Sequence, residues 1–135
     1  MSVLDQLLAR KPVLTDGAWG TQLQALGLES GEVPDSWNLT HPERVEQVAR
    51  AYVEAGSQVI LTNTFRSNRI TLAPHGLDGQ VAEINRKGAA ISRAAAAGRA
   101  KVFASIGPSG KMVVAGEVTE EQLREAFAEQ AQALA

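Results

Sequence analysis

The segment Gln58-Val59-Ile60-Leu61-Thr62-Asn63-Thr64-Phe65 decides the fold class, because an apolar run passes directly into a polar tip. The run over residues 58–62 is typical of a buried strand. In an α/β protein with parallel strands, a small ligand is held just beyond the carboxyl ends of the strands. Thr62, Asn63 and Thr64 are therefore candidate ligand-binding residues.

Two other strand candidates end in the same way. Residues 12–16 form a short apolar run that ends at Asp16 and is followed by Gly17. Residues 101–106 form a third run, with Ser105 near its end and small residues beyond it that let backbone approach a ligand closely. Three such strand ends predict one shared site.

Helical patterns alternate with these strands. A loop rich in Gly, Ser, Pro and Asp extends to about residue 39, and Thr40-His41-Pro42-Glu43 has the form of a capping box at a helix start. Asp78 is placed to cap a long helix that Gly98 stops, and Thr119-Glu120-Glu121-Gln122 is a second capping box. The strand-helix alternation predicts a parallel sheet. This sheet is either a small open one or the first portion of an eight-stranded barrel of about 250 residues.

Length and composition limit the class of function. The chain has 135 residues, of which 44% are apolar and 21% charged, as in one globular domain with a core. A net charge of -2 with scattered basic residues argues against a nucleic-acid partner. No apolar run of about 18 residues could span a bilayer, and Asp5 interrupts any signal peptide. We therefore expect a soluble, cytoplasmic chain with no membrane partner.

The chain contains no cysteine, which excludes disulfides and thiolate metal ligands. His41 and His75 lie far apart in the sequence and are more typical of a first helical turn and a loop than of a metal site. A nucleophilic Ser105 would need a base within hydrogen-bond reach, and the sequence supplies no convincing partner. We therefore expect no catalytic residue and no metal ligand, and assign Ser105 to shape or substrate contact.

Several motifs in order resemble the amino-terminal portion of the homocysteine S-methyltransferase domain, which also occurs in cobalamin-dependent methionine synthase and betaine-homocysteine methyltransferase. They are Asp16-Gly17-Ala18-Trp19-Gly20-Thr21, Trp37-Asn38-Leu39-Thr40-His41-Pro42-Glu43, Ala55-Gly56-Ser57, Thr62-Asn63-Thr64-Phe65 and Ile106-Gly107-Pro108. The resemblance covers nearly the whole chain. It implies that residues 1–135 are a partial barrel domain: an α/β fold, the amino-terminal part of a (β/α)8 TIM barrel, with about three parallel strands and flanking helices, truncated after the third strand and the following helix.

The same resemblance implies methyl transfer to the thiol of homocysteine to give methionine. In such enzymes a zinc ion held by cysteine thiolates binds the homocysteine sulfur as thiolate. Cobalamin or a folate is a candidate methyl carrier, whereas Arg66 stands where a betaine-type enzyme is expected to bring an aromatic residue. The family places its cysteines in later strands, so we expect the isolated chain to be inactive.

Within this resemblance, Asp16 is the candidate that receives the homocysteine amino group, because a carboxylate can pair with an ammonium ion. Gly17 removes a side chain that would block close approach. Asp-Gly is also a common turn pair. Thr62, Asn63 and Thr64 offer hydroxyl and amide groups to the substrate, or they satisfy backbone groups where the strand becomes a loop.

Two alternatives belong to other classes of protein. The chain could be a non-catalytic half-barrel module that self-associates into a homo-oligomer through open sheet edges, since unpaired strands invite pairing. It could also be an unrelated phosphate-binding α/β enzyme. The second alternative is the weaker one, because the loops lack both G-x-G-x-x-G and G-x-x-x-x-G-K-[ST].

Overall fold

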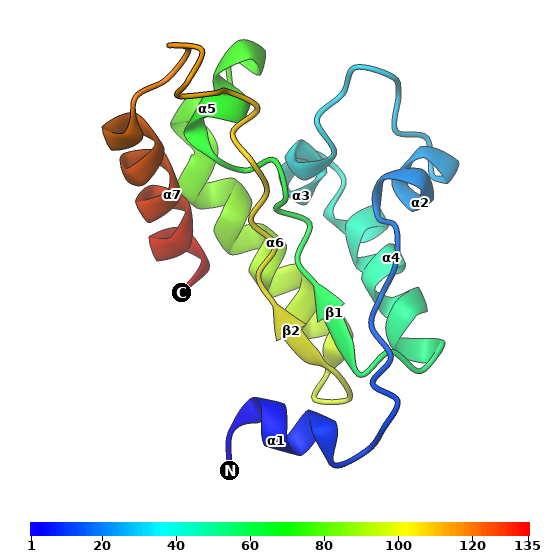
Figure 1. Cartoon of the computed structure of the whole chain (residues 1–135). Helices are drawn as coiled ribbons and strands as arrows, with labels where there is room; N and C mark the ends of the chain where they lie inside the picture. Colours follow the sequence, from blue (N-terminus) through cyan, green and yellow to red (C-terminus); the bar gives the residue numbers. More distant parts are fainter.

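Two short parallel strands form the centre of the computed structural model, which describes residues 1–135 (Figure 1). Strand β1 (Val59–Leu61) pairs with β2 (Lys101–Phe103), and Ile60 lies opposite Val102. Helices α4 (Pro42–Glu54) and α6 (Val81–Ala96) pack against the strands and against each other. The alternation of strands and helices predicted from the sequence is therefore present.

The strand predicted at residues 12–16 is reduced to one parallel bridge, between Thr15 and Val59. The Asp16 N–H donates to the Val59 carbonyl at 3.0 Å, and the Gln58 N–H donates to the Leu14 carbonyl at 2.8 Å. This segment therefore runs along the edge of β1 opposite to β2. Pro12 lacks a backbone donor, which limits the ladder at the start of the segment.

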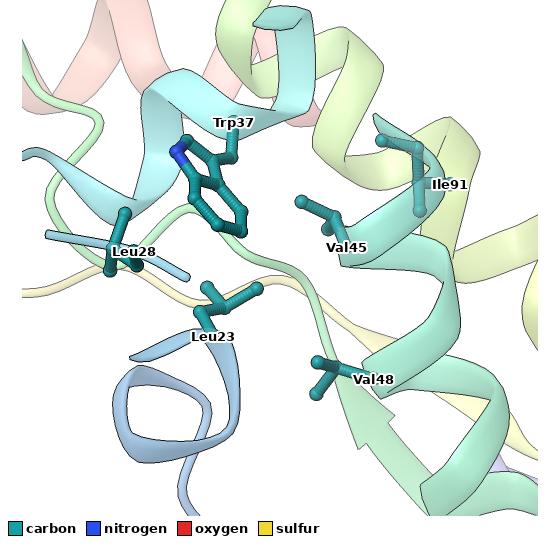
Figure 2. Packing of buried hydrophobic residues seen from close by; sticks show 6 residues of the cluster. All are labelled: Leu23, Leu28, Trp37, Val45, Val48 and Ile91. Carbon is teal, nitrogen blue, oxygen red and sulfur yellow. The ribbon is translucent and has the colours of Figure 1, made fainter. Parts of the chain in front are cut away.

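Helix α4 forms because its apolar residues recur at helical spacing and are buried on one face. Its Val45 and Val48 belong to a cluster with Trp37, which is only 1% exposed. Figure 2 shows the Trp37 ring between the side chains of Leu23, Leu28 and Val45. A second cluster joins α4 and α6 to Ile60 of β1 and contains the small residues Ala95 and Ala96. The two clusters fix both helices against the strands, and so fix where the strand tips lie.

The loop expected up to residue 39 is wrong, because the segment contains a 3-10 turn, η1 (Pro34–Ser36), and helix α3 (Trp37–Thr40). The capping box expected at Thr40 is also wrong. The Thr40 hydroxyl instead donates back to the carbonyl of Ser36, the last residue of η1, at 3.3 Å. Helix α4 instead begins at Pro42, whose missing N–H and fixed φ suit the first helical position.

The remaining helices complete the outer layer. Helix α1 (Val3–Leu8) precedes the first bridge, and α2 (Gly20–Ala25) follows it. Helix α5 (Arg69–Leu72) continues into η2 (Ala73–His75). None of the helices has both the length and the apolar character that crossing a membrane would require.

Helix α6 begins at Val81 rather than at Asp78, so the predicted cap is wrong. Residues Asp78–Gln80 form a 3-10 turn, η3, and the Asp78 carboxylate lies 3.9 Å from Arg69 instead. Helix α7 (Glu120–Leu134) confirms the other capping box: the Gln122 N–H donates to the Thr119 hydroxyl, and the Thr119 N–H donates to the Gln122 side chain. Helix α7 packs on α6, away from the strands (Figure 1).

Candidate functional site

A cavity of about 290 Å³ lies at the carboxyl ends of β1 and β2. Residues 61–66 of the β1 tip supply most of its wall, and Ser105 supplies the part beyond β2. The remaining wall comes from the start of α2, with Trp19 and Gly20, and from the η1 turn, with Pro34 and Asp35. Four of the residues predicted from the sequence, Thr62, Asn63, Thr64 and Ser105, therefore share one cavity.

The two threonines tie the tip of β1 to the chain beyond β2. The Thr64 hydroxyl donates to the Ser105 carbonyl at 2.8 Å, and the Ser105 N–H donates to the Thr62 hydroxyl at 3.0 Å. The two hydroxyl oxygens are 2.6 Å apart. Because the single Thr64 proton goes to Ser105, Thr62 must be the donor in this pair. The Ser105 hydroxyl itself has no partner in the chain, so it is free to meet a ligand.

Asn63 holds the η1 turn and α3 beside the strand tip. Its amide nitrogen donates to the Pro34 carbonyl and to the Asn38 side-chain oxygen, both at 3.0 Å. In turn, the Asn38 side-chain nitrogen donates to the Asn63 carbonyl at 2.8 Å and to the Ile84 carbonyl at 3.0 Å. The Asn63 side chain therefore shapes the cavity wall indirectly, by holding η1 and α3 in place.

The β1 tip also presents backbone donors. The N–H groups of Asn63, Thr64 and Phe65 have no acceptor in the chain, although all three residues line the cavity. The guanidinium group of Arg66, in the same wall, forms no ion pair with any carboxylate of the chain. Successive free N–H groups beside a cation are suited to an anionic ligand such as a carboxylate.

Asp35 is a buried carboxylate in this wall that no motif of the sequence indicated. It is 2% exposed, and its Oδ2 accepts from the Ser67 hydroxyl at 2.5 Å and from the Arg66 N–H at 2.8 Å. Burial raises the pKa of Asp35 to about 6, although the bonds from Ser67 and Arg66 oppose that rise. Its neighbours Pro34 and Ser36 are typical of a turn, so only the fold reveals that it is buried.

Asp16 and Gly17 line a second, adjacent hollow of about 480 Å³. Its wall is mostly apolar and includes residues of α1 and the sheet face at Phe103. Asp16 Oδ2 accepts from the indole N–H of Trp19 and from the Leu61 N–H, each at 2.7 Å. Leu61 lines both hollows, so Asp16 lies beside the first cavity without lining it. The ligand role of these two residues stays a prediction.

The largest hollow of the molecule, about 750 Å³, lies elsewhere, between α5 and α7. None of the predicted site residues lines it. Its Arg69 is already paired with Glu129 at 2.7 Å, and both side chains are partly exposed. We therefore place the candidate site at the strand ends, where free donors and a buried carboxylate converge.

The chain has no set of side chains that could hold a metal ion. It lacks cysteine, and no three His, Asp or Glu side chains lie close enough together to coordinate one. The residues present therefore do not fit a zinc ion of the kind implied by the resemblance.

Comparison with known proteins shows what the chain is similar to. Residues 13–135 match the family described as homocysteine S-methyltransferase. Two relatives named methionine synthase, from Mycobacterium tuberculosis and Mycobacterium leprae, are 31% and 30% identical over 93% of this chain. The chain spans only 12% and 11% of the length of these relatives.

Two crystal structures share the fold: the homocysteine methyltransferase MmuM from Escherichia coli in an oxidized and a metallated form. Each has a TM-score of 0.80 at 24% identity, and the match covers 97% of this chain and 52% of the MmuM chain. This likeness confirms the predicted fold class, an α/β arrangement with parallel strands that forms part of a TIM barrel.

Proposed function

Because this chain belongs to the homocysteine S-methyltransferase family, we propose that it forms the amino-terminal part of a barrel that methylates the thiol of homocysteine to give methionine. Residues 1–135 would then be a partial barrel domain. The proposal is supported by the chain matching 52% of a homocysteine methyltransferase structure. It is also supported by a cavity at the carboxyl ends of the strands, where barrel enzymes bind their ligands.

The free N–H groups of Asn63, Thr64 and Phe65 carry the proposal, because they suit the carboxylate of an amino acid. The positive charge of Arg66, which forms no ion pair, favours the same group. On the other side of Leu61, Asp16 keeps one carboxylate oxygen without a hydrogen bond and would receive the substrate ammonium. Zwitterion recognition of this kind fixes the amino-acid end of homocysteine.

The remaining predicted residues shape this pocket. Gly17 leaves room beside Asp16, and a Cβ there would come within 3.3 Å of the Tyr52 hydroxyl. Thr62 and Thr64 hold the two strand tips together, and Ser105 offers its free hydroxyl to the substrate. The chain thus binds and orients the substrate.

Activation of the thiol is assigned to a part of the barrel outside these 135 residues. A bound zinc ion would supply it by stabilising the thiolate, and this chain provides no ligands for zinc. A cobalamin or folate methyl carrier would also be met by other parts of the protein. We therefore expect the isolated chain to bind homocysteine without methylating it.

Titration of the ¹⁵N-labelled chain with L-homocysteine, kept reduced and followed by NMR, tests this proposal. We expect saturable shifts at the amides of Asn63, Thr64 and Phe65, because these N–H groups would gain an acceptor. The analogue 3-aminopropane-1-thiol, which lacks the carboxylate, should leave these amides nearly unmoved. Shifts confined to residues outside the strand ends, or no shifts at all, would contradict the proposal.

A self-associating half-barrel is the second candidate, and the hollow beside α1 favours it. The wall of this hollow is mostly apolar, and its Phe103 is 39% exposed on a strand that has a partner on one side only. Exposed apolar edges of this kind invite pairing with a second copy. Sedimentation velocity separates the candidates: a concentration-dependent dimer supports self-association, whereas a compact monomer at all concentrations rules it out.

A further inference from the structure

The geometry points to Asn38 and Gln130 as positioning residues, which aim the backbone donors of the β1 tip at the ligand from behind. Gln130 Nε2 donates to the Thr64 carbonyl at 2.8 Å, and Asn38 Nδ2 donates to the Asn63 carbonyl at 2.8 Å. The role rests on the proposed function, since it concerns the groups that would bind the substrate carboxylate.

Each carbonyl shares a peptide unit with one of the free N–H groups. The Thr64 carbonyl belongs to the peptide that carries the Phe65 N–H, and the Asn63 carbonyl belongs to the one that carries the Thr64 N–H. A trans peptide is planar, so its C=O and N–H point in opposite directions. A donor that holds the carbonyl therefore fixes the direction of the N–H. It also polarises the peptide, which makes the N–H a stronger donor.

The two amide side chains are built into the core. Asn38 and Gln130 are both 0% exposed, and burial of a polar side chain is unfavourable unless hydrogen bonds compensate for it. The Gln130 oxygen has no partner, so only the donor end of this side chain is satisfied. The hydrogen bonds of Gln130 Nε2 to the Thr64 carbonyl and to Asn85 therefore determine where this side chain lies.

The packing around these bonds leaves little freedom. Gly88 of α6 lies against them, and a Cβ at this position would come within 2.7 Å of both Asn38 Nδ2 and Thr64 Cγ2. Asn85, one turn earlier, accepts from Gln130 Nε2 at 3.2 Å and donates to the Ser67 carbonyl at 2.9 Å. Three helices, α3, α6 and α7, thus hold carbonyls of residues 63–67.

Gln130→Met tests this role, with Gln132→Met as the matched control. Methionine is similar in size but donates no hydrogen bond, and Gln132 is an exposed residue of the same helix. In the wild-type chain we expect a scalar coupling across the bond from Gln130 Nε2 to the Thr64 carbonyl carbon. Gln130→Met should weaken L-homocysteine binding about tenfold, the size expected when a hydrogen bond to a charged group is impaired.

The choice of ligand separates positioning from general damage. Gln130→Met should bind 3-aminopropane-1-thiol like the wild type, because this probe needs no carboxylate site. Equal losses for both ligands, or no coupling in the wild type, would overturn the inference. Acetate separates the inference from the proposed function. Even if homocysteine fails to bind, acetate should shift the Phe65 amide signal of the wild type. Loss of this shift in Gln130→Met would still support the role, whereas an equal shift in both chains would overturn it.

Discussion

Gly107→Ala should lower the free energy of unfolding by about 3 kcal/mol, at the upper end of the range for an overpacked core position. A Cβ on Gly107 would lie 2.4 Å from the Phe65 carbonyl oxygen and 2.8 Å from two atoms of the Phe65 ring. The carbonyl cannot move away by a side-chain rotation, and it also accepts the Gly107 N–H at 3.0 Å. Relief of the clash must therefore separate the segments that follow β1 and β2.

Because the same segments line the cavity, the substitution should also disturb the amide resonances of residues 62–66. Urea unfolding followed by tryptophan fluorescence measures the loss of stability. Gly79→Ala is the control, since a Cβ at Gly79 meets no atom within 4 Å and its φ is not in the left-handed region. Equal stability of the Gly107 and Gly79 variants would show that the loop beyond β2 adapts without separating the strand tips.

Local signals in the sequence predicted those parts of the fold that depend on neighbouring residues. The capping box at Thr119 is confirmed because both of its bonds join residues three apart. The similar pattern at Thr40 fails because α3 ends at this residue and Pro42 can start α4 without a side-chain cap. One pattern thus has two outcomes, and the preceding turn of helix decides between them.

The candidate site was predictable only in part. Thr62, Asn63 and Thr64 could be selected because a polar tip follows a strand, and the structure brings them together with Ser105. Gln130 could not be selected, because it meets Thr64 across 66 residues of sequence and looks like any polar residue of a helix.

Asp35 escaped selection for the same reason. A carboxylate in a Pro-Asp-Ser turn is normally solvated, and only its contact with Ser67, 32 residues later, reveals its burial. Side chains that act through distant contacts have no local signature in a single sequence.

Asp35→Asn should raise the stability of the chain at pH 8 by up to about 3 kcal/mol, the equivalent of the pKa change on folding. Burial raises the pKa of Asp35 from 3.8 to about 6. The folded chain thus holds this proton more tightly than the unfolded chain. The stability contributed by this group is full below about pH 4 and is lost as the pH rises through 6. Asparagine cannot ionise, yet its oxygen can still accept from Ser67 and Arg66.

The difference in unfolding free energy between Asp35→Asn and the wild type should therefore grow from pH 4 to pH 7 and then level off. Urea unfolding at a series of pH values measures this difference, and parallel pH profiles for the two proteins would refute the assignment. A buried charge that lowers stability is typical of a functional site. The same variant should consequently bind L-homocysteine more weakly while it unfolds less readily, because the negative charge of Asp35, in the wall of the adjoining cavity, would add to that of Asp16 in attracting the substrate ammonium. A more stable variant with undiminished binding would instead limit Asp35 to holding the η1 turn against Arg66 and Ser67.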